Sequence, residues 1–104
     1  MIVLLGQTFK DQDDKQMDLT LRDVAKQALL ATFEDEKNMA LEAKVKRYDL
    51  YLKIKDASDP ADLTTDEVVE IKKLIGKAYS ILIVGQAVKF LEGEPVSSKA
   101  KKGN

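Results

Sequence analysis

The sequence predicts a mainly α-helical fold, a small four-helix domain that begins with a β-hairpin or strand. Apolar residues recur at helical spacing in four stretches, at about residues 20–32, 39–55, 65–78 and 80–92. Two of these stretches open on the same Asp-Leu-Thr signal of a helix start. The chain has 104 residues, 44% hydrophobic and 34% charged, and this composition predicts one globular domain over residues 1–94.

Extended structure is expected in residues 1–18. Ile2–Leu5 form an apolar run, and Thr8–Lys10 and Lys15–Met17 stand on either side of Asp11–Asp14. Aspartate-rich tetrads favour turns, because the short side chain bonds to nearby backbone and tolerates a left-handed conformation. The pattern therefore predicts a small β-hairpin.

The same aspartates resemble the start of an EF-hand calcium loop, but the rest of that loop is missing. Lys15, Gln16 and Arg22 stand where it needs a ligand, a glycine and the closing glutamate. The chain also has no histidine and no cysteine, which removes the usual zinc ligands and the common imidazole and thiolate catalysts. We therefore expect no metal, no cofactor, no catalytic residue and no small-molecule substrate, so that the protein is not an enzyme.

Thr20 and Thr64 are the expected N-caps of the first and third helices. Each precedes an acidic residue by three positions, Asp23 or Glu67, which can complete a capping box. The first helix then presents one apolar face, which comprises Leu21, Val24, Ala25, Ala28 and Leu29. The residues expected to be buried in the third helix are Val68, Ile71, Leu74, Ile75 and Ala78.

The second helix is expected from Met39 to about Lys55, with Asn38 as its cap. An amphipathic helix turns its apolar stripe toward the core. The main stripe here is Leu41, Val45, Tyr48 and Leu52, and it is widened by Leu50, Tyr51 and Ile54. This is also the most basic helix, and its candidate contacts for an acidic partner or nucleic acid are Lys44, Lys46, Arg47 and Lys53.

The most apolar stretch, Asp66–Leu91, is expected to form two helices that meet near Tyr79–Ser80 and serve as the hub for earlier segments. Ser80 is the expected cap of the fourth helix. That helix is apolar on two sides, which is typical of a helix that is central or covered by a partner. Ile81–Val84 is β-branched enough to suit a strand, and this alternative stays open. The candidate protein interface consists of Ile81, Ile83, Ala87 and Phe90.

The remaining features concern the setting of the protein. Residues 95–104 are expected to form a disordered, lysine-rich tail. The formal net charge of −1 lacks the basic excess typical of nucleic-acid-binding domains. The apolar run Ala78–Val88 has about half of the ~20 residues that a membrane span needs, and no signal peptide is recognisable. We therefore expect no membrane association and a cytoplasmic protein.

Four segments together carry a resemblance to a known group: Asp18–Leu30, Lys44–Tyr48, Glu70–Gly76 and Val84–Ala87. Over residues 8–93 the chain resembles small, largely uncharacterised helical proteins encoded by tailed bacteriophages. The resemblance implies a setting in the host cytoplasm or the virion. It also implies that the protein binds a phage or host protein, or itself, as an assembly or chaperone-like factor or as a modulator of a host protein.

Two alternative functions remain open at this point. One is a nucleic-acid-binding accessory protein that uses the basic second helix and the lysines of the tail, although nucleic acid is the less favoured partner. The other is a structural component of the virion.

Overall fold

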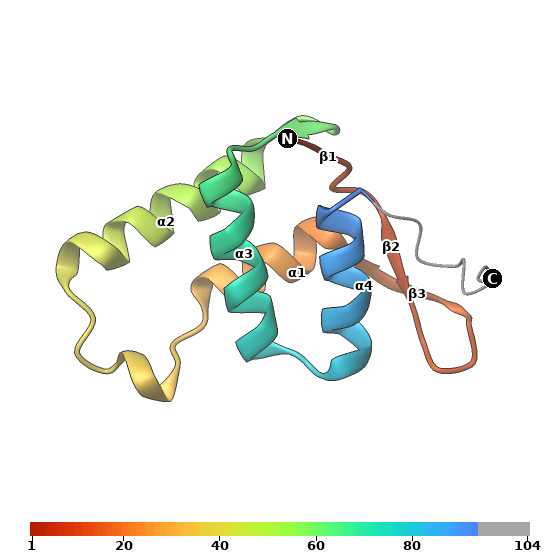
Figure 1. Cartoon of the computed structure of the whole chain (residues 1–104), viewed down its shortest axis with the longest axis horizontal. Coiled ribbons are helices and arrows are strands. Elements are labelled where there is room, and N and C mark those ends of the chain that lie inside the picture. The colour runs from red at the N-terminus through yellow and green to blue at the C-terminus, as the bar shows by residue number, and fades with distance from the viewer. Residues whose placement is uncertain (94–104) are drawn as a thin grey trace.

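The computed structural model describes residues 1–93, which form four α-helices and two small antiparallel sheets (Figure 1). The helices are α1 (Leu21–Leu30), α2 (Leu41–Asp56), α3 (Thr65–Ala78) and α4 (Ile81–Leu91), and a 3-10 turn, η1 (Glu34–Glu36), precedes α2. The strands are β1 (Ile2–Val3), β2 (Thr8–Lys10), β3 (Gln16–Thr20) and β4 (Ala61–Asp62). The mainly helical fold class with an N-terminal hairpin is therefore confirmed, while the expected tail, residues 95–104, lies outside the described residues.

Both predicted capping boxes are present. The Thr20 hydroxyl accepts from the Asp23 N–H at 3.2 Å, and the Asp23 carboxylate accepts from the Thr20 N–H at 3.1 Å. Thr64 and Glu67 make the same pair of bonds, at 3.1 and 2.8 Å. Each box satisfies two backbone N–H groups that a helix start otherwise leaves without partners, which fixes where α1 and α3 begin.

Other helix ends differ from the prediction. The first helix ends at Leu30 rather than near Thr32, and α2 begins at Leu41 with Ala40 at its N-cap. Asn38 does not cap α2, because η1 and a bond from Met39 N–H to the Glu36 carbonyl (3.1 Å) continue the preceding turn up to that point. Ser80 occupies the N-cap position of α4, but its hydroxyl makes no capping bond.

The hairpin β2–β3 docks on α4 through one buried amide. Gln86 accepts from the Lys10 N–H and donates to the Lys10 carbonyl, both at 2.9 Å. Beside it, the rings of Phe9 and Phe90 meet edge to face, with centroids 5.1 Å apart. The paired amide bonds satisfy an edge-strand residue and the only buried polar side chain of residues 1–93, so the hairpin is held in one position.

Strand β1 pairs with β4, a contact that the sequence did not predict. The Asp59 carboxylate reinforces it by accepting from the N–H groups of Leu5 (2.8 Å) and Gly6 (2.9 Å). A Cβ at position 6 would lie 2.6 Å from an Asp59 carboxylate oxygen, which is closer than real side chains come. Glycine at this position therefore permits the close approach of the carboxylate to the backbone.

The C-terminal helical pair is present, but it is not the hub of the fold. Residues 81–84 are helical, so the strand alternative is wrong. The helix α1 contacts both α2 and α3, and α2 packs chiefly on α1 rather than on the C-terminal pair. The predicted buried face of α1 is buried throughout, and so is that of α3 except for Ala78, which lies at the exposed last position of the helix.

Candidate functional site

Helix α2 meets the core mainly through its C-terminal half. Of its 16 residues only Ile54, close to its C-terminal end, is buried. Figure 1 shows the amino-terminal half of α2 extending to the left, away from the group formed by α1, α3 and α4. Most of the surface of this helix therefore faces solvent.

The apolar stripe of α2 lies on this solvent-facing surface. Leu41 is 73% exposed, Val45 50% and Tyr48 53%. The spacing i, i+4, i+7 places the three side chains on one side of the helix. We call this surface the α2 face, defined as Leu41, Val45 and Tyr48, and the half-buried Leu52 continues it toward the core. The prediction that this stripe packs on the core is wrong.

The reason is that α2 carries a second, shorter row of residues on its opposite side. This row consists of Arg47 and Leu50, which are half-buried, and Ile54, which is buried. This row attaches the helix to α1, to α3 and to the segment of residues 31–40 that joins α1 to α2 and contains η1, which we call the connector. Because the sequence offers two rows at helical spacing, the pattern alone does not decide which one turns inward.

A hollow of about 300 Å³ adjoins the α2 face where α1 ends. Its walls include Tyr48 and Lys44 from α2, and Leu30 and Ala31 from the end of α1. Leu30 is itself 55% exposed. The hollow therefore extends the apolar surface beyond α2 itself, a feature that no single stretch of sequence reveals.

Arg22 fastens the C-terminal end of α2. Its guanidinium donates from Nη1 to the carbonyls of Ile54 (2.8 Å), Lys55 (3.3 Å) and Ala57 (2.8 Å). The last carbonyls of a helix have no partner within the helix, so a cation placed there satisfies them and opposes the negative end of the helix dipole. This side chain on α1 thus holds α2 at one end and leaves the α2 face free.

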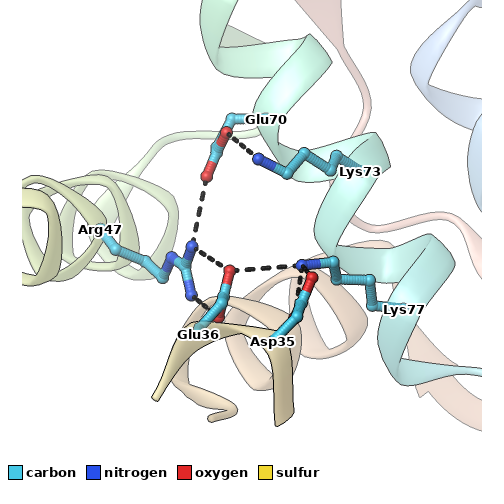
Figure 2. A network of polar contacts seen from close by, with 6 residues as sticks. All are labelled: Asp35, Glu36, Arg47, Glu70, Lys73 and Lys77. Carbon is cyan, nitrogen blue, oxygen red and sulfur yellow. Dashed lines mark hydrogen bonds and ion pairs between the residues drawn. The ribbon is translucent and has the colours of Figure 1, made fainter. Parts of the chain in front are cut away.

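An ion pair holds the other half of α2. Arg47 binds Glu36 of η1 through two parallel bonds of 2.8 and 2.9 Å, with side chains only 12% and 11% exposed (Figure 2). The same guanidinium lies 3.6 Å from the Glu70 carboxylate, which in turn lies 3.9 Å from Lys73. Two-fold arginine–carboxylate bonding fixes geometry as well as charge, so the connector, α2 and α3 are held in one arrangement.

Lys77 of α3 adds a second tie to the connector. Its ammonium group lies 2.9 Å from Asp35 and 3.4 Å from Glu36, as Figure 2 shows. The same ammonium lies 5.3 Å from the centroid of the Phe33 ring. The hydrogen bond that the Lys77 ammonium donates to the Asp35 carboxylate is the main cause that raises the pKa of Lys77 above its ordinary value. The connector is therefore anchored at successive residues rather than left as a loose loop.

The Glu36 ion pair predicts a loss of stability in acid. The hydrogen bond from Arg47 lowers the pKa of Glu36 from 4.5 to about 2, although burial acts in the opposite direction. The unfolded chain therefore takes up this proton first, so the stabilisation is complete above pH 4.5 and is lost as the pH falls toward 2. We expect urea unfolding between about pH 7 and pH 2 to show this decline.

Matched variants isolate the contribution of the Glu36 carboxylate to the loss of stability in acid. Glu36→Gln should be less stable than wild type at neutral pH and should show a flatter pH dependence in acid. Glu34→Gln is the control, because the Glu34 side chain is 81% exposed and its one ion pair within residues 1–93 is with exposed Lys37, at 3.3 Å. Equal acid slopes for wild type and Glu36→Gln would contradict the assignment.

A groove of about 910 Å³ lies between the connector, α2 and α3. Met39, Ala43 and Leu50 contribute apolar surface to its wall, and acidic and basic side chains also line it. These charged residues include Glu34, Asp66, Glu70, Lys37, Lys46 and Lys73. Charges of mixed sign create no single-sign field, so the groove does not select a polyanion.

The structure does not bring the four basic candidate residues of α2 together. Arg47 is bound to Glu36, and Lys53 lies 2.7 Å from Glu67. Lys44 and Lys46 are exposed, but they lie on different sides of the helix. No continuous basic strip therefore forms on α2.

The predicted interface on α4 is corrected by the structure. Ile83, Ala87 and Phe90 are in the core, at 7%, 0% and 7% exposure. They turn inward because α4 packs between α3 and the hairpin, so a partner cannot reach them. Ile81 is 91% exposed, since it is the first residue after the turn from α3.

Within residues 1–93 no three acidic side chains gather closely enough to hold a metal ion. In the aspartate-rich turn, Asp11 accepts from the N–H groups of Asp13 (2.9 Å) and Lys15 (3.0 Å), so its carboxylate shapes the turn. No helix in the described part of the chain is long and apolar enough to cross a membrane.

The chain matches no protein-family model, and comparisons with curated proteins and with solved structures give no match. The candidate site is therefore defined by the geometry of α2 alone.

Proposed function

We propose that the protein is a non-enzymatic binding factor that contacts another protein through the α2 face. One observation carries this proposal: three large apolar side chains stand in line on a projecting helix, each at least half exposed. Single exposed apolar residues are ordinary on protein surfaces, whereas grouped ones mark interaction sites. Apolar side chains at i, i+4 and i+7 are also the usual anchors when a helix docks on another helix or in a groove.

The rigid mounting of α2 supports the same proposal. Arg22 holds its C-terminal end, and the Arg47–Glu36 pair holds its amino-terminal half. A helix that is already formed and fixed loses little conformational entropy when a partner docks. The α2 face is therefore preorganised for binding a partner.

The resemblance to small proteins of tailed bacteriophages supports a setting in the infected bacterium. In that setting the protein would serve as an assembly or chaperone-like factor, or would modulate a host protein. A nucleic-acid-binding role has less support, because Arg47 and Lys53 are already paired with Glu36 and Glu67.

The proposal predicts that Val45→Asp abolishes partner capture without unfolding the protein. Wild-type and variant chains would be used as bait in lysates of phage-infected and uninfected bacteria, with captured proteins identified by mass spectrometry. A carboxylate in the middle of the α2 face should weaken binding at least ten-fold, or about 1.4 kcal/mol, because it is desolvated in the complex.

The matched control is Val69→Asp, which makes the same change at a valine of α3 with 55% exposure, against 50% for Val45. Proteins captured by wild type and Val69→Asp but absent from Val45→Asp would support the proposal. Identical captures by all three baits would overturn the assignment of the α2 face.

A further inference from the structure

We propose that the occupant of the α2 face is a second copy of this chain, whose own α2 lies alongside, parallel and in register. This inference rests on the proposed function and specifies its partner. It is carried by the order of charges on either side of the apolar row.

The apolar row of α2 has the spacing of a coiled-coil seam. Leu41, Val45, Tyr48 and Leu52 are separated by four, three and four residues. This is the alternation of d and a positions over two heptads, with Val45 and Leu52 at a and Leu41 and Tyr48 at d. A β-branched residue at a and leucine at d favour two-stranded parallel pairing, a preference that Val45 and Leu41 meet and that Leu52 and Tyr48 do not. The seam therefore suits another helix of the same kind.

The two flanks of the seam carry opposite charges. Glu42, Asp49 and Asp56 recur every seven residues and occupy every e position. On the other side of the seam, Lys44 occupies the first g position and the uncharged Tyr51 occupies the second. All four charged side chains are exposed, and neither Lys44 nor Asp49 forms an ion pair with any residue of the described part, 1–93. One side of the seam is thus acidic and the other begins with a free cation.

This segregation selects the orientation of the second helix. In a parallel pair, a residue at g faces the e residue five positions later on the other chain. Lys44 of each copy then faces Asp49 of the other, which gives two symmetric ion pairs. In an antiparallel pair the e positions face each other, so Asp49 would meet Glu42 or Asp56 of the second copy and repel it. The charges therefore favour the parallel, two-fold symmetric arrangement.

The attachment of α2 leaves room for this pairing. The row that binds the body, Arg47, Leu50 and Ile54, lies opposite the seam, so the two bodies would stand on the outer sides of the helix pair. The seam is only about two heptads long, and interfaces under about 1,200 Å² in total are typically transient. We therefore expect a reversible dimer with a dissociation constant of roughly 10 to 100 µM.

Sedimentation equilibrium of the full chain tests the association itself. Between about 5 and 500 µM, a range that brackets this affinity, wild type and Val69→Asp should pass from monomer to dimer, whereas Val45→Asp should stay monomeric. Far-ultraviolet circular dichroism would confirm that each variant is folded. A wild type that is monomeric at all concentrations would overturn the inference.

Engineered cysteines test the orientation, because the chain has no cysteine of its own. The two test variants are Leu41→Cys and Tyr48→Cys, at seam positions that lie about 10 Å apart along the helix. In a parallel pair each residue faces its own copy, so both variants should form disulfide-linked dimers under mild oxidation. Lys46→Cys, on an outer side of the helix, is the control and should form few. Cross-linking at one seam position but not the other would overturn the parallel register.

Charge exchange tests the ion pair without touching the seam. Lys44→Glu and Asp49→Lys should each weaken self-association by roughly five-fold, because each replaces two attractions by two repulsions. A mixture of the two variants should form heterodimers at least as tight as the wild-type dimer, since every facing pair is then opposite in charge. Heterodimers as weak as either variant alone would overturn the Lys44–Asp49 assignment.

These outcomes are separable from those of the lysate experiment. A monomeric wild type whose captures still depend on Val45 would retain the proposed binding role and remove the second copy as its partner. A dimer that is sensitive to Val45→Asp, with no other captured protein, would show that self-association is the binding that the α2 face supports.

Discussion

Replacing Ile75 by aspartate is expected to unfold the protein. Ile75 lies in α3 with 0% exposure, inside the core that α3 shares with α1. The substitution removes a large apolar side chain and leaves a carboxylate with no partner in a dry environment. The expected loss is about 4 kcal/mol or more, a large part of the 5–15 kcal/mol of a typical domain.

Thermal denaturation followed by circular dichroism would measure this loss. Val69→Asp is the control on the same helix, because Val69 is 55% exposed and its variant should melt within a few degrees of wild type. A melting temperature of Ile75→Asp equal to that of wild type would mean that α3 presents a different side to the core.

Replacing Arg22 by methionine is expected to cost about 2–4 kcal/mol, because hydrogen bonds from charged donors contribute about 1.5–3 kcal/mol each. The substitution keeps most of the apolar stem but removes the bonds to the carbonyls of Ile54 and Ala57, both at 2.8 Å. Those carbonyls would have to be satisfied by water at a partly buried helix end. Urea unfolding would measure the loss.

Lys26→Met, on the same helix and without a hydrogen bond or ion pair to any residue of 1–93, is the control for Arg22→Met. It should change stability by no more than about 0.5 kcal/mol. Amide hydrogen exchange should also become faster at the C-terminal end of α2 in Arg22→Met. Unchanged exchange there would contradict the capping role of Arg22.

The starts of α1 and α3 could be predicted from the sequence because their determinants are local. Thr20 with Asp23, and Thr64 with Glu67, lie three residues apart, and each pair makes both bonds of its capping box. The faces of α1 and α3 could also be predicted, since each of these helices has one continuous apolar side. In α1 and α3 the capping residues and the apolar periodicity indicate the same helix, and the prediction of both helices is confirmed.

The orientation of α2 and α4 could not be predicted in this way. Both helices have apolar residues on two sides, so periodicity leaves the inward side undetermined. In α2 the longer row, with Leu41 and Val45, faces solvent, because the helix meets the body only through residues such as Ile54. In α4 the candidate interface residues Ile83 and Phe90 instead complete the core.

Polar contacts between segments that are distant in the sequence could not be predicted either. Arg22 reaches carbonyls 32 to 35 residues away, and Gln86 binds the backbone of a residue 76 positions earlier. Nothing in the local sequence distinguishes these side chains from solvated ones. Such bonds depend on the assembled fold, so only the structure shows them.

The Asp59 carboxylate accepts hydrogen bonds from the backbone N–H groups of Leu5 and Gly6. These bonds couple position 59 to position 6, which lies 53 residues earlier in the chain. Any side chain at position 6 would collide with that carboxylate, since even a Cβ would come within 2.6 Å of it. A larger residue there requires a shorter or displaced one at position 59. In chains that share this fold the two sites should therefore vary together, and their joint variation would be a signature by which distant relatives of this protein could be recognised.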